Sequence, residues 1–363
     1  MQRRKFLKSS VGVGALAGLG FTGLSVEGLG RTTMASPDPL ASAGSAGQIG
    51  RPVRVVSIGV KARIKSLEEI AKVVDSEGSQ GADLIALPET WRGQNDQGSE
   101  ETLSGPTVTA MAALAKKHRT YIVCPIDRKD GNHRLNSAVL LDRSGQVVTV
   151  YNKIFPWFPE FRVTPPVKPG QEVAVHQADF GRLGLAICFD IDFPEVWQGL
   201  ADNGAELVMW PSAYSGGNAL KAHALMHHYY IATATQTPDC TVYDITGEEL
   251  LYQKSAEVNV SRITLDLDRG VYDRDAIDGR QKCGERKEKL LKEHGDDVVE
   301  EKYLEREDWF VLRAKRPGVS SRELARSYGL VEKAELVRRS RGLIDQRRGW
   351  AFSEKVLRKS QAS

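Results

Sequence analysis

Apolar and polar residues follow two patterns along most of the chain. Short apolar or β-branched runs, typical of strands, alternate with runs in which apolar residues recur every three or four positions, typical of helices. The expected strands are 53–59, 82–89, 121–125, 137–142, 147–151, 183–187, 206–212 and 262–268, and a strand-turn signal lies at 243–247. The expected helices are 66–74, 107–118, 194–203 and 219–233. This alternation predicts a layered α/β fold.

The helix expected over 66–74 has a recognisable start. Leu67, Ile70 and Val74 recur at helical spacing, and Ser66 with Glu69 forms a capping-box pattern. The helix expected from Pro194 begins with proline and an acid in its first turn, which is also a typical start.

Three residues with complementary chemistry come at the ends of expected strands. Glu89 closes the strand 82–89, Lys153 follows the strand 147–151, and Cys188 follows the apolar run 183–187. In open α/β folds, ligands bind beyond the carboxyl ends of strands, so these side chains can converge. A cysteine nucleophile needs a base and a cation for the oxyanion, which the other two offer. Singly, the commoner roles are surface charges and a buried structural cysteine.

The position of Cys188 between a strand and a helix has an electrostatic consequence. Backbone N–H groups and the positive end of a helix favour a thiolate over a thiol. At this position the Cys188 thiol can lie near such groups, which would favour its ionised form.

Three motifs in order resemble those of the carbon–nitrogen hydrolase (nitrilase) superfamily over residues 52–270. They are Leu87-Pro-Glu89, Tyr151-Asn-Lys153-Ile-Phe-Pro-Trp157, and Ala186-Ile-Cys188-Phe-Asp190 with Phe193-Pro-Glu195. The resemblance implies a four-layer αββα sandwich that assembles as a homodimer or a higher homo-oligomer. It also implies a catalytic triad of Glu89, Lys153 and Cys188.

The stretch from Ile154 to Glu160 is most similar to the aliphatic amidase branch of that superfamily. Glu160 resembles a second, supporting glutamate of the branch, at a slightly different spacing from the lysine. The implied reaction is hydrolysis of a small linear amide to a carboxylic acid and ammonia or an amine through a cysteine thioester. The backbone N–H of Phe189 would then help Lys153 to hold the oxyanion.

Several alternatives stay open from the residues alone. In this superfamily the same triad serves nitrile hydrolysis, N-carbamoyl-amine hydrolysis and acyl transfer, although beyond residue 35 the chain lacks the membrane segment expected of the acyltransferases. From other classes, a binding protein without activity or a regulator using the basic tail is conceivable. We expect Trp157, Trp210 and Tyr214 to line the substrate pocket, and a role in the core is an equal alternative for Trp210.

Composition and cysteine spacing exclude some classes of function. The chain has 363 residues, 41% hydrophobic and 27% charged, with a net charge of +3, as in ordinary globular proteins. The four cysteines have neither zinc-site nor CxxC spacing, which argues against a thiol oxidoreductase. Cys124 lies in mid-strand, whereas Cys240 and Cys283 are expected in polar loops, with a disulfide between them left open. His223 and His227 have the spacing of a metal pair but no third ligand, so we expect no metal and no cofactor.

The first 51 residues have the pattern of an export signal and a linker. Residues 1–35 join a basic start, including Arg3-Arg4, to a short Gly/Ala-rich apolar stretch, which resembles a twin-arginine signal peptide. Residues 36–51 are expected to be a flexible linker. The sequence thus predicts a periplasmic enzyme with no stable membrane insertion once the signal is removed.

Residues 271–363 differ from the rest in charge. Of these 93 residues, 41 are charged, and the pattern predicts a charged helical C-terminal extension. Residues 319–330 weakly resemble a helix-turn-helix with Leu324, Ala325 and Leu330 as core positions. Export argues against a nucleic-acid partner, so we expect the extension to wrap a neighbouring subunit, as tails of the family often do.

Overall fold

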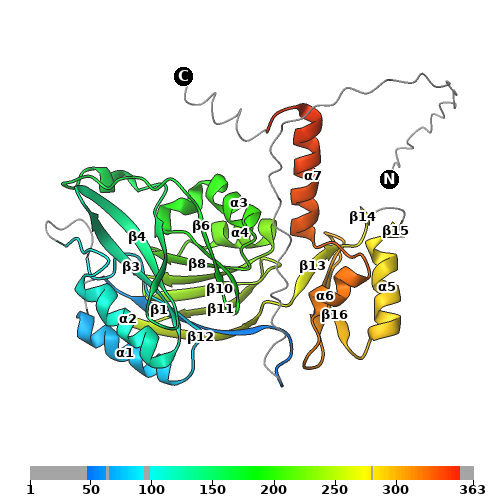
Figure 1. Ribbon diagram of the computed structural model, residues 1–363, viewed down its shortest axis with the longest axis horizontal. Helices are drawn as coiled ribbons and strands as arrows, with labels where there is room; N and C mark the ends of the chain where they lie inside the picture. The colour runs from blue at the N-terminus through cyan, green and yellow to red at the C-terminus, as the bar shows by residue number, and fades with distance from the viewer. Residues whose placement is uncertain (1–46, 63–64, 94–98, 279–280, 352–363) are drawn as a thin grey trace, which may run out of the picture. The chain divides into compact units, whose positions relative to one another are not determined.

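The computed structural model describes residues 47–62, 65–93, 99–278 and 281–351. The expected signal peptide and residues 36–46 of the expected linker lie outside these ranges. Within them the chain forms two six-stranded sheets, a three-stranded sheet and a two-stranded sheet, with helices on the faces of the larger sheets (Figure 1).

The first sheet has the strand order β12-β1-β2-β3-β4-β5. Its strands are β1 (Pro52–Val60), β2 (Leu84–Ala86), β3 (Tyr121–Asp130), β4 (His133–Leu141), β5 (Val147–Asn152) and β12 (Val258–Asp266). The pairs β1–β2 and β2–β3 are parallel and the others antiparallel. The carboxyl end of β2, which leads to Glu89, therefore lies at the centre of the sheet.

The second sheet has the order β11-β10-β9-β8-β7-β6. Its strands are β6 (Ala174–Ala178), β7 (Gly181–Leu185), β8 (Leu207–Ser212), β9 (Tyr230–Thr235), β10 (Asp239–Tyr243) and β11 (Glu249–Lys254). Here β7, β8 and β9 are parallel, and β7 leads directly to Cys188. Each large sheet thus has a parallel centre that ends at a candidate site residue.

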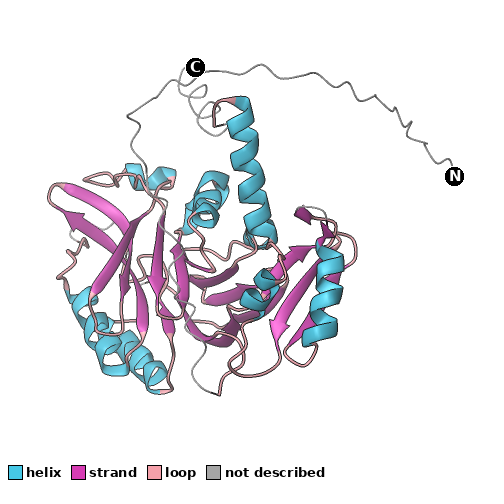
Figure 2. Ribbon diagram, turned by 45° about the vertical axis from the view of Figure 1, so that its right-hand side comes forward, coloured by secondary structure: helices cyan, strands magenta, loops and turns pink. Residues whose placement is uncertain are grey.

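Helices cover the outer face of each large sheet. The outer helices are α1 (Leu67–Ser79), α2 (Pro106–His118), α3 (Pro194–Asp202) and α4 (Asn218–His227). The first two pack on the first sheet in one buried cluster, and the other two pack on the second sheet in another (Figure 2). The predicted capping box is present: Ser66 Oγ accepts from Glu69 N and the Glu69 carboxylate accepts from Ser66 N.

The two large sheets pack face to face through a third apolar cluster. Val55 of β1 and Val123 of β3 belong to this cluster together with Leu185 of β7 and Met209 of β8. The alternate residue Val56 of β1 belongs to the cluster under α1 and α2, as the period-two pattern of a strand requires. These layers form the αββα sandwich, so the expected fold class is confirmed.

One expected helix is wrong in its second half. The helix expected over 219–233 ends at His227, where His228 adopts a left-handed conformation with φ of 57°, and β9 begins at Tyr230. Aromatic and β-branched residues of 229–235 favour a strand, and they fill the centre of the second sheet. Neighbouring helix-like apolar spacing concealed this boundary in the sequence.

The C-terminal extension is helical, as expected, and also contains strands. Its helices are α5 (Cys283–His294), α6 (Ser321–Ser327) and α7 (Lys333–Arg348), and its strands are β13 (Gly270–Asp273), β14 (Ile277–Asp278), β15 (Gln281–Lys282), β16 (Val298–Leu304) and β17 (Trp309–Ala314). β13, β17 and β16 form a three-stranded sheet with its own core. Ala325 and Leu330 are buried there and Leu324 packs against them, which confirms their expected core positions.

Polar contacts join α6 to the end of the sandwich domain. Arg322 makes ion pairs with Glu206, at the start of the β8 segment, and with Glu332 (Nη2 to Oε2, 2.6 Å). The buried carboxylate of Asp268 accepts hydrogen bonds from Ser320 Oγ and Ser321 N. The extension therefore packs on its own chain through these residues.

No helix among the residues that the structure describes is long and apolar enough to span a membrane.

Candidate active site

Cys188 lies on a sharp turn at the end of β7. Its backbone has φ of +46°, and the short 3-10 helix η2 (Cys188–Asp192) follows directly. A residue with a side chain in the left-handed region is strained, by about 1–3 kcal/mol, and such strain gathers at functional sites. The indole Nε1 of the buried Trp210 donates to the Cys188 carbonyl at 3.1 Å, which holds the turn in place. The side chain of Cys188 is 8% exposed.

Lys153 and two carboxylates form a buried cluster. Lys153 Nζ donates to Glu89 Oε1 at 2.9 Å and to Glu160 Oε2 at 2.6 Å, and all three side chains are almost fully buried. Glu160 belongs to the short helix η1 (Phe158–Phe161). The structure therefore brings Glu89, Lys153 and Glu160 together, and Cys188 lies within electrostatic range of Glu89 and Lys153.

Sequence reasoning missed Asn136 on β4. Its Nδ2 donates to Glu89 Oε1 at 2.7 Å and to Glu160 Oε1 at 2.9 Å. Its carbonyl accepts from Lys153 N at 2.9 Å, so Asn136 and Lys153 are neighbours across two paired strands. The sequence signal was a polar residue just before an apolar strand, which is too common to single out a site residue.

One oxygen of Glu89 remains available. Among the residues that the structure describes, the buried atoms Glu89 Oε2 and Asn136 Oδ1 have no hydrogen-bond partner. A buried acceptor without a partner is unfavourable unless a ligand or a proton occupies it. Glu89 can therefore accept a proton on Oε2 while Oε1 stays held.

Two sets of hydrogen bonds connect the two sheets next to the candidate site. The fully buried Asp190, two residues after Cys188, accepts from Tyr151 Oη at 2.7 Å, from Phe155 N at 2.9 Å and from Ile187 N at 2.9 Å. The second connection is a hydrogen bond that Gln236 Nε2, just after β9, donates to the main-chain carbonyl of Glu89. These contacts fix the lysine and glutamate segments against the cysteine turn.

The electrostatics favour a neutral thiol and a charged ammonium. Burial, and next the negative charge of Glu89, raise the pKa of the Cys188 thiol well above its ordinary value. Desolvation and the charge of Glu89 outweigh the backbone dipoles that favour a thiolate at this turn. Burial alone would lower the pKa of Lys153, but the negative charges of the Glu89 and Glu160 carboxylates raise it instead. Lys153 is a cation across the physiological range.

The residues expected to line a substrate pocket lie in different surroundings. Trp157 is 55% exposed, and its backbone N donates to Glu160 Oε2 at 2.6 Å. Tyr214 is 40% exposed and packs edge-on against Trp210, with 5.5 Å between ring centroids. Trp210 is buried in the core beneath the Cys188 turn, which matches the alternative left open for it. Phe189 packs edge-on against Phe193 at 5.4 Å.

The remaining three cysteines are buried, and none of them forms a disulfide. Cys124 is in β3, Cys240 in β10, and Cys283 opens α5, so the expected polar loops and the disulfide left open between the last two are not present. Apolar neighbours in two separate cores surround the first and the last of them.

The expected histidine pair serves the packing of α4. His223 stacks on Trp197 with 4.3 Å between ring centroids, and its Nε2 lies 2.9 Å from the Ile191 carbonyl. Within the described ranges no group of three or more His, Cys, Asp or Glu side chains could hold a metal ion.

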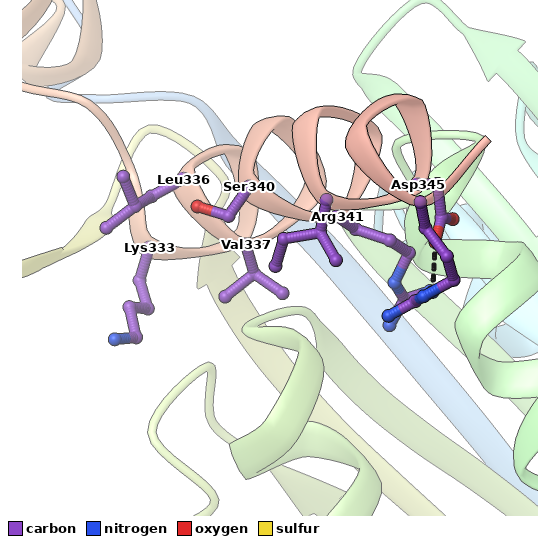
Figure 3. Close-up of a pocket in the computed structure, with 8 residues that line it drawn as sticks. Lys333, Leu336, Val337, Ser340, Arg341 and Asp345 are labelled. Carbon is purple, nitrogen blue, oxygen red and sulfur yellow. Dashed lines mark hydrogen bonds and ion pairs between the residues drawn. The ribbon is translucent and has the colours of Figure 1, made fainter. Parts of the chain in front are cut away.

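A groove of about 560 Å³ runs along one face of α7 and is separate from the cysteine site. It is lined by residues of this helix alone: Lys333, Leu336, Val337, Ser340, Arg341, Ile344, Asp345 and Arg348 (Figure 3). None of the residues around Cys188 lines it.

Comparisons with known proteins agree on one family. The family model described as carbon-nitrogen hydrolase matches residues 54–269. A hydrolase of Schizosaccharomyces pombe is 30% identical over 169 residues, and the match covers 42% of this chain and 49% of that protein, about half its length. A nitrilase of Pyrococcus abyssi is 29% identical over 205 residues, covering 53% of this chain and 77% of that protein.

A solved structure shows the same fold. A cysteine-to-alanine mutant of the amidase from Nesterenkonia sp. AN1, in complex with butyramide, is 22% identical, has a TM-score of 0.54, and is matched over 61% of this chain and 94% of that one.

Proposed function

The chain belongs to the carbon–nitrogen hydrolase (nitrilase) superfamily, and we propose that it hydrolyses small linear amides to a carboxylic acid and ammonia or an amine. The observation that carries this proposal is the free, buried Oε2 of Glu89 beside a neutral thiol and a lysine ammonium. This arrangement offers a base, a nucleophile and an oxyanion donor in one buried site.

The first half of the proposed reaction forms a thioester. Glu89 Oε2 takes the Sγ proton as Sγ bonds to the amide carbon, because burial keeps the resting thiol protonated. The C–O double bond opens to an oxyanion, which Lys153 Nζ and the Phe189 N–H stabilise. Collapse of this intermediate breaks the C–N bond, and Glu89 returns the proton to the leaving nitrogen. Ammonia or an amine departs, and the acyl group stays on Sγ.

The second half consumes water. Glu89 takes a proton from a water molecule as its oxygen bonds to the thioester carbon, and the same two donors stabilise the second oxyanion. The C–S bond then breaks, the carboxylic acid leaves, and Glu89 reprotonates Sγ. One water molecule is consumed for each C–N bond cleaved, and the triad returns to its initial state.

Two observations favour an amide over a nitrile. The free acceptor on Glu89 suits an N–H donor, which an amide offers and a nitrile lacks. In addition, a related protein of Synechocystis, 26% identical over 197 residues, is named a deaminated glutathione amidase, and the Nesterenkonia structure holds butyramide. The exposed Trp157 and Tyr214 would contact the acyl group of such a substrate.

The test is release of ammonia or amine from a panel of linear amides, nitriles and N-carbamoyl amines. We expect turnover of amides by the native protein, none by Cys188→Ala, and a mass increase of one acyl group on the Cys188 peptide after rapid acid quenching. Preference for nitriles or carbamoyl amines would reassign the substrate within the superfamily. Turnover that survives Cys188→Ala would refute the nucleophile, and native protein inactive on the whole panel would favour a binding protein.

We also propose that the protein is exported to the periplasm and forms a homo-oligomer. The twin-arginine pattern of residues 1–35 supports the first proposal. Export is tested by cell fractionation of the native chain and of an Arg3→Lys/Arg4→Lys variant, which we expect to stay in the cytoplasm. Light scattering of the purified protein tests the second.

A further inference from the structure

Asn136 holds both carboxylates of the site with one amide group. Its side chain is 1% exposed, and Nδ2 lies 2.7 Å from Glu89 Oε1 and 2.9 Å from Glu160 Oε1. We propose that Asn136 is a positioning residue that fixes Glu89 so that Oε2 is the oxygen that takes the Cys188 proton. This inference rests on the role of Glu89 in the proposed function.

The orientation of the amide follows from its neighbours. An amide oxygen in place of Nδ2 would lie against two carboxylate oxygens, with three acceptors together and no donor between them. Only the NH2 group can lie there, and it uses both of its N–H bonds on the two carboxylates. Asn136 and Lys153 therefore both donate to Glu89 Oε1, and Oε2 is the oxygen left for chemistry.

Asn136 is a neutral donor, and either an apolar or a cationic side chain in its place would impair Lys153 or Glu89. Lys153 has three N–H donors, of which Glu89 and Glu160 use two, leaving one for the oxyanion. If Asn136 were apolar, the ammonium would be the main support of both carboxylates and would be drawn away from the oxyanion. If Asn136 were a second cation, it would stabilise the anionic form of Glu89 and weaken it as a base.

The fold couples Asn136 to Lys153. The two residues face each other across β4 and the end of β5, where Lys153 N donates to the Asn136 carbonyl at 2.9 Å. A shift of either strand would move both donors together relative to Glu89. The pair thus acts as one rigid support for the base.

The test compares Asn136→Leu and Asn136→Asp with the native enzyme on its best amide over a range of pH. Asn136→Leu removes the donor, and we expect kcat to fall about 100-fold, the usual worth of a well-placed general base, with KM within about threefold. The carboxyl that Asn136→Asp introduces keeps one O–H donor while it is protonated, whereas its ionised form repels Glu89 and Glu160. The activity of Asn136→Asp should therefore be retained at low pH and lost as pH rises through the ionisation of the new carboxyl.

A matched control is Asn259→Leu. Asn259 is also a buried asparagine on a strand of the first sheet, but its Nδ2 donates to Gln253 O and Ser261 Oγ. We expect its substitution to alter stability without changing the pH profile of kcat. If Asn136 had only a structural role, both of its variants would lose the same fraction of activity at every pH, and the inference would be overturned.

Alkylation of Cys188 by iodoacetamide, followed by peptide mass spectrometry, separates this inference from the proposed function. The reaction needs no amide substrate but depends on the base beside the thiol, so both Asn136 variants should react about tenfold more slowly at pH 8. If the native protein hydrolyses no amide, the proposed function fails while this rate still tests Asn136. Unchanged alkylation in a folded variant contradicts the inference, and should Asn136→Leu not fold, Asn136→Asp at low pH provides the test.

Discussion

Replacing Lys153 by methionine should strongly destabilise the fold as well as abolish activity. Methionine has a similar volume, so the change chiefly removes one charge and its two hydrogen bonds. Glu89 and Glu160, which are 1% and 2% exposed, would then face each other without a cation. At an effective dielectric constant of about 20, each pair at these distances contributes roughly 6 kcal/mol of attraction before desolvation.

Desolvation of the ammonium opposes this attraction, and the net cost of removing one partner from a buried ion pair is about 3–5 kcal/mol. Because the pKa of Lys153 is raised above its ordinary value of 10.5, its contribution is fully present below pH 10.5 and is lost only as pH rises further. At pH 7 the whole effect should therefore appear in the free energy of unfolding, measured by urea titration followed by tryptophan fluorescence.

Glu160→Gln should partly rescue Lys153→Met. The second substitution removes one of the two facing charges, so the double variant should regain about 1–3 kcal/mol over the single one. The control is Lys302→Met, which breaks a half-exposed ion pair with Glu248 and should cost less than about 1 kcal/mol. A double variant no more stable than Lys153→Met would refute the electrostatic reasoning.

Two further substitutions probe the surroundings of the site, and a third probes the contact between the C-terminal extension and the sandwich. Asp190→Asn replaces one of the two carboxylate oxygens by an NH2 group, which leaves at least one of the donors Tyr151, Phe155 and Ile187 without its acceptor and should cost about 1–3 kcal/mol in urea titrations. Burial raises the pKa of Asp190 from 3.8 to about 6, so the native fold favours the protonated carboxyl. The stabilisation that this preference gives is lost as pH rises from about 4 to 6. The difference in free energy of unfolding between the native protein and Asp190→Asn should therefore become smaller over that pH range. Trp157→Ala removes an exposed indole but keeps the backbone N–H to Glu160, so KM for amides should rise several-fold with kcat nearly unchanged, and a fall in kcat alone would contradict this. Arg322→Met breaks the ion pairs with Glu206 and Glu332 and should speed proteolytic release of residues 271–351 relative to the sandwich, which electrophoresis would detect.

Much of the fold could be predicted because its signals are local. The strand and helix patterns of the sandwich follow from periodicity, and the start of α1 follows from the capping pair Ser66 and Glu69. The boundary between α4 and β9 could not be predicted, because the helix-like spacing of apolar residues before His228 conceals it. The three-stranded sheet of the extension was also missed, since the charged run at 300–302 interrupts β16 and hides its alternation.

The residues of the candidate site also fall into those that could be predicted from the sequence and those that could not. Glu89, Lys153 and Cys188 could be proposed because each follows an expected strand with a distinct chemical type. Asn136 could not, because its importance arises only when β2, β4 and the loop after β5 bring three polar groups together. The raised pKa of Cys188 could not be inferred for a related reason: backbone dipoles follow from local sequence, whereas the extent of burial and the nearness of Glu89 depend on the whole fold.

The buried charges suggest why the two halves of the sandwich hold one geometry. Asp190 lies in the second sheet's segment yet accepts hydrogen bonds from Tyr151 and Phe155 on either side of Lys153. A carboxylate buried so completely is costly unless its donors stay in place, so a shift of one sheet against the other would leave this charge unsatisfied. The same bonds therefore penalise sliding of the sheets and keep the lysine in range of the cysteine turn. The relative position of Lys153 and Cys188 therefore depends on the same hydrogen bonds that stabilise the interface between the sheets.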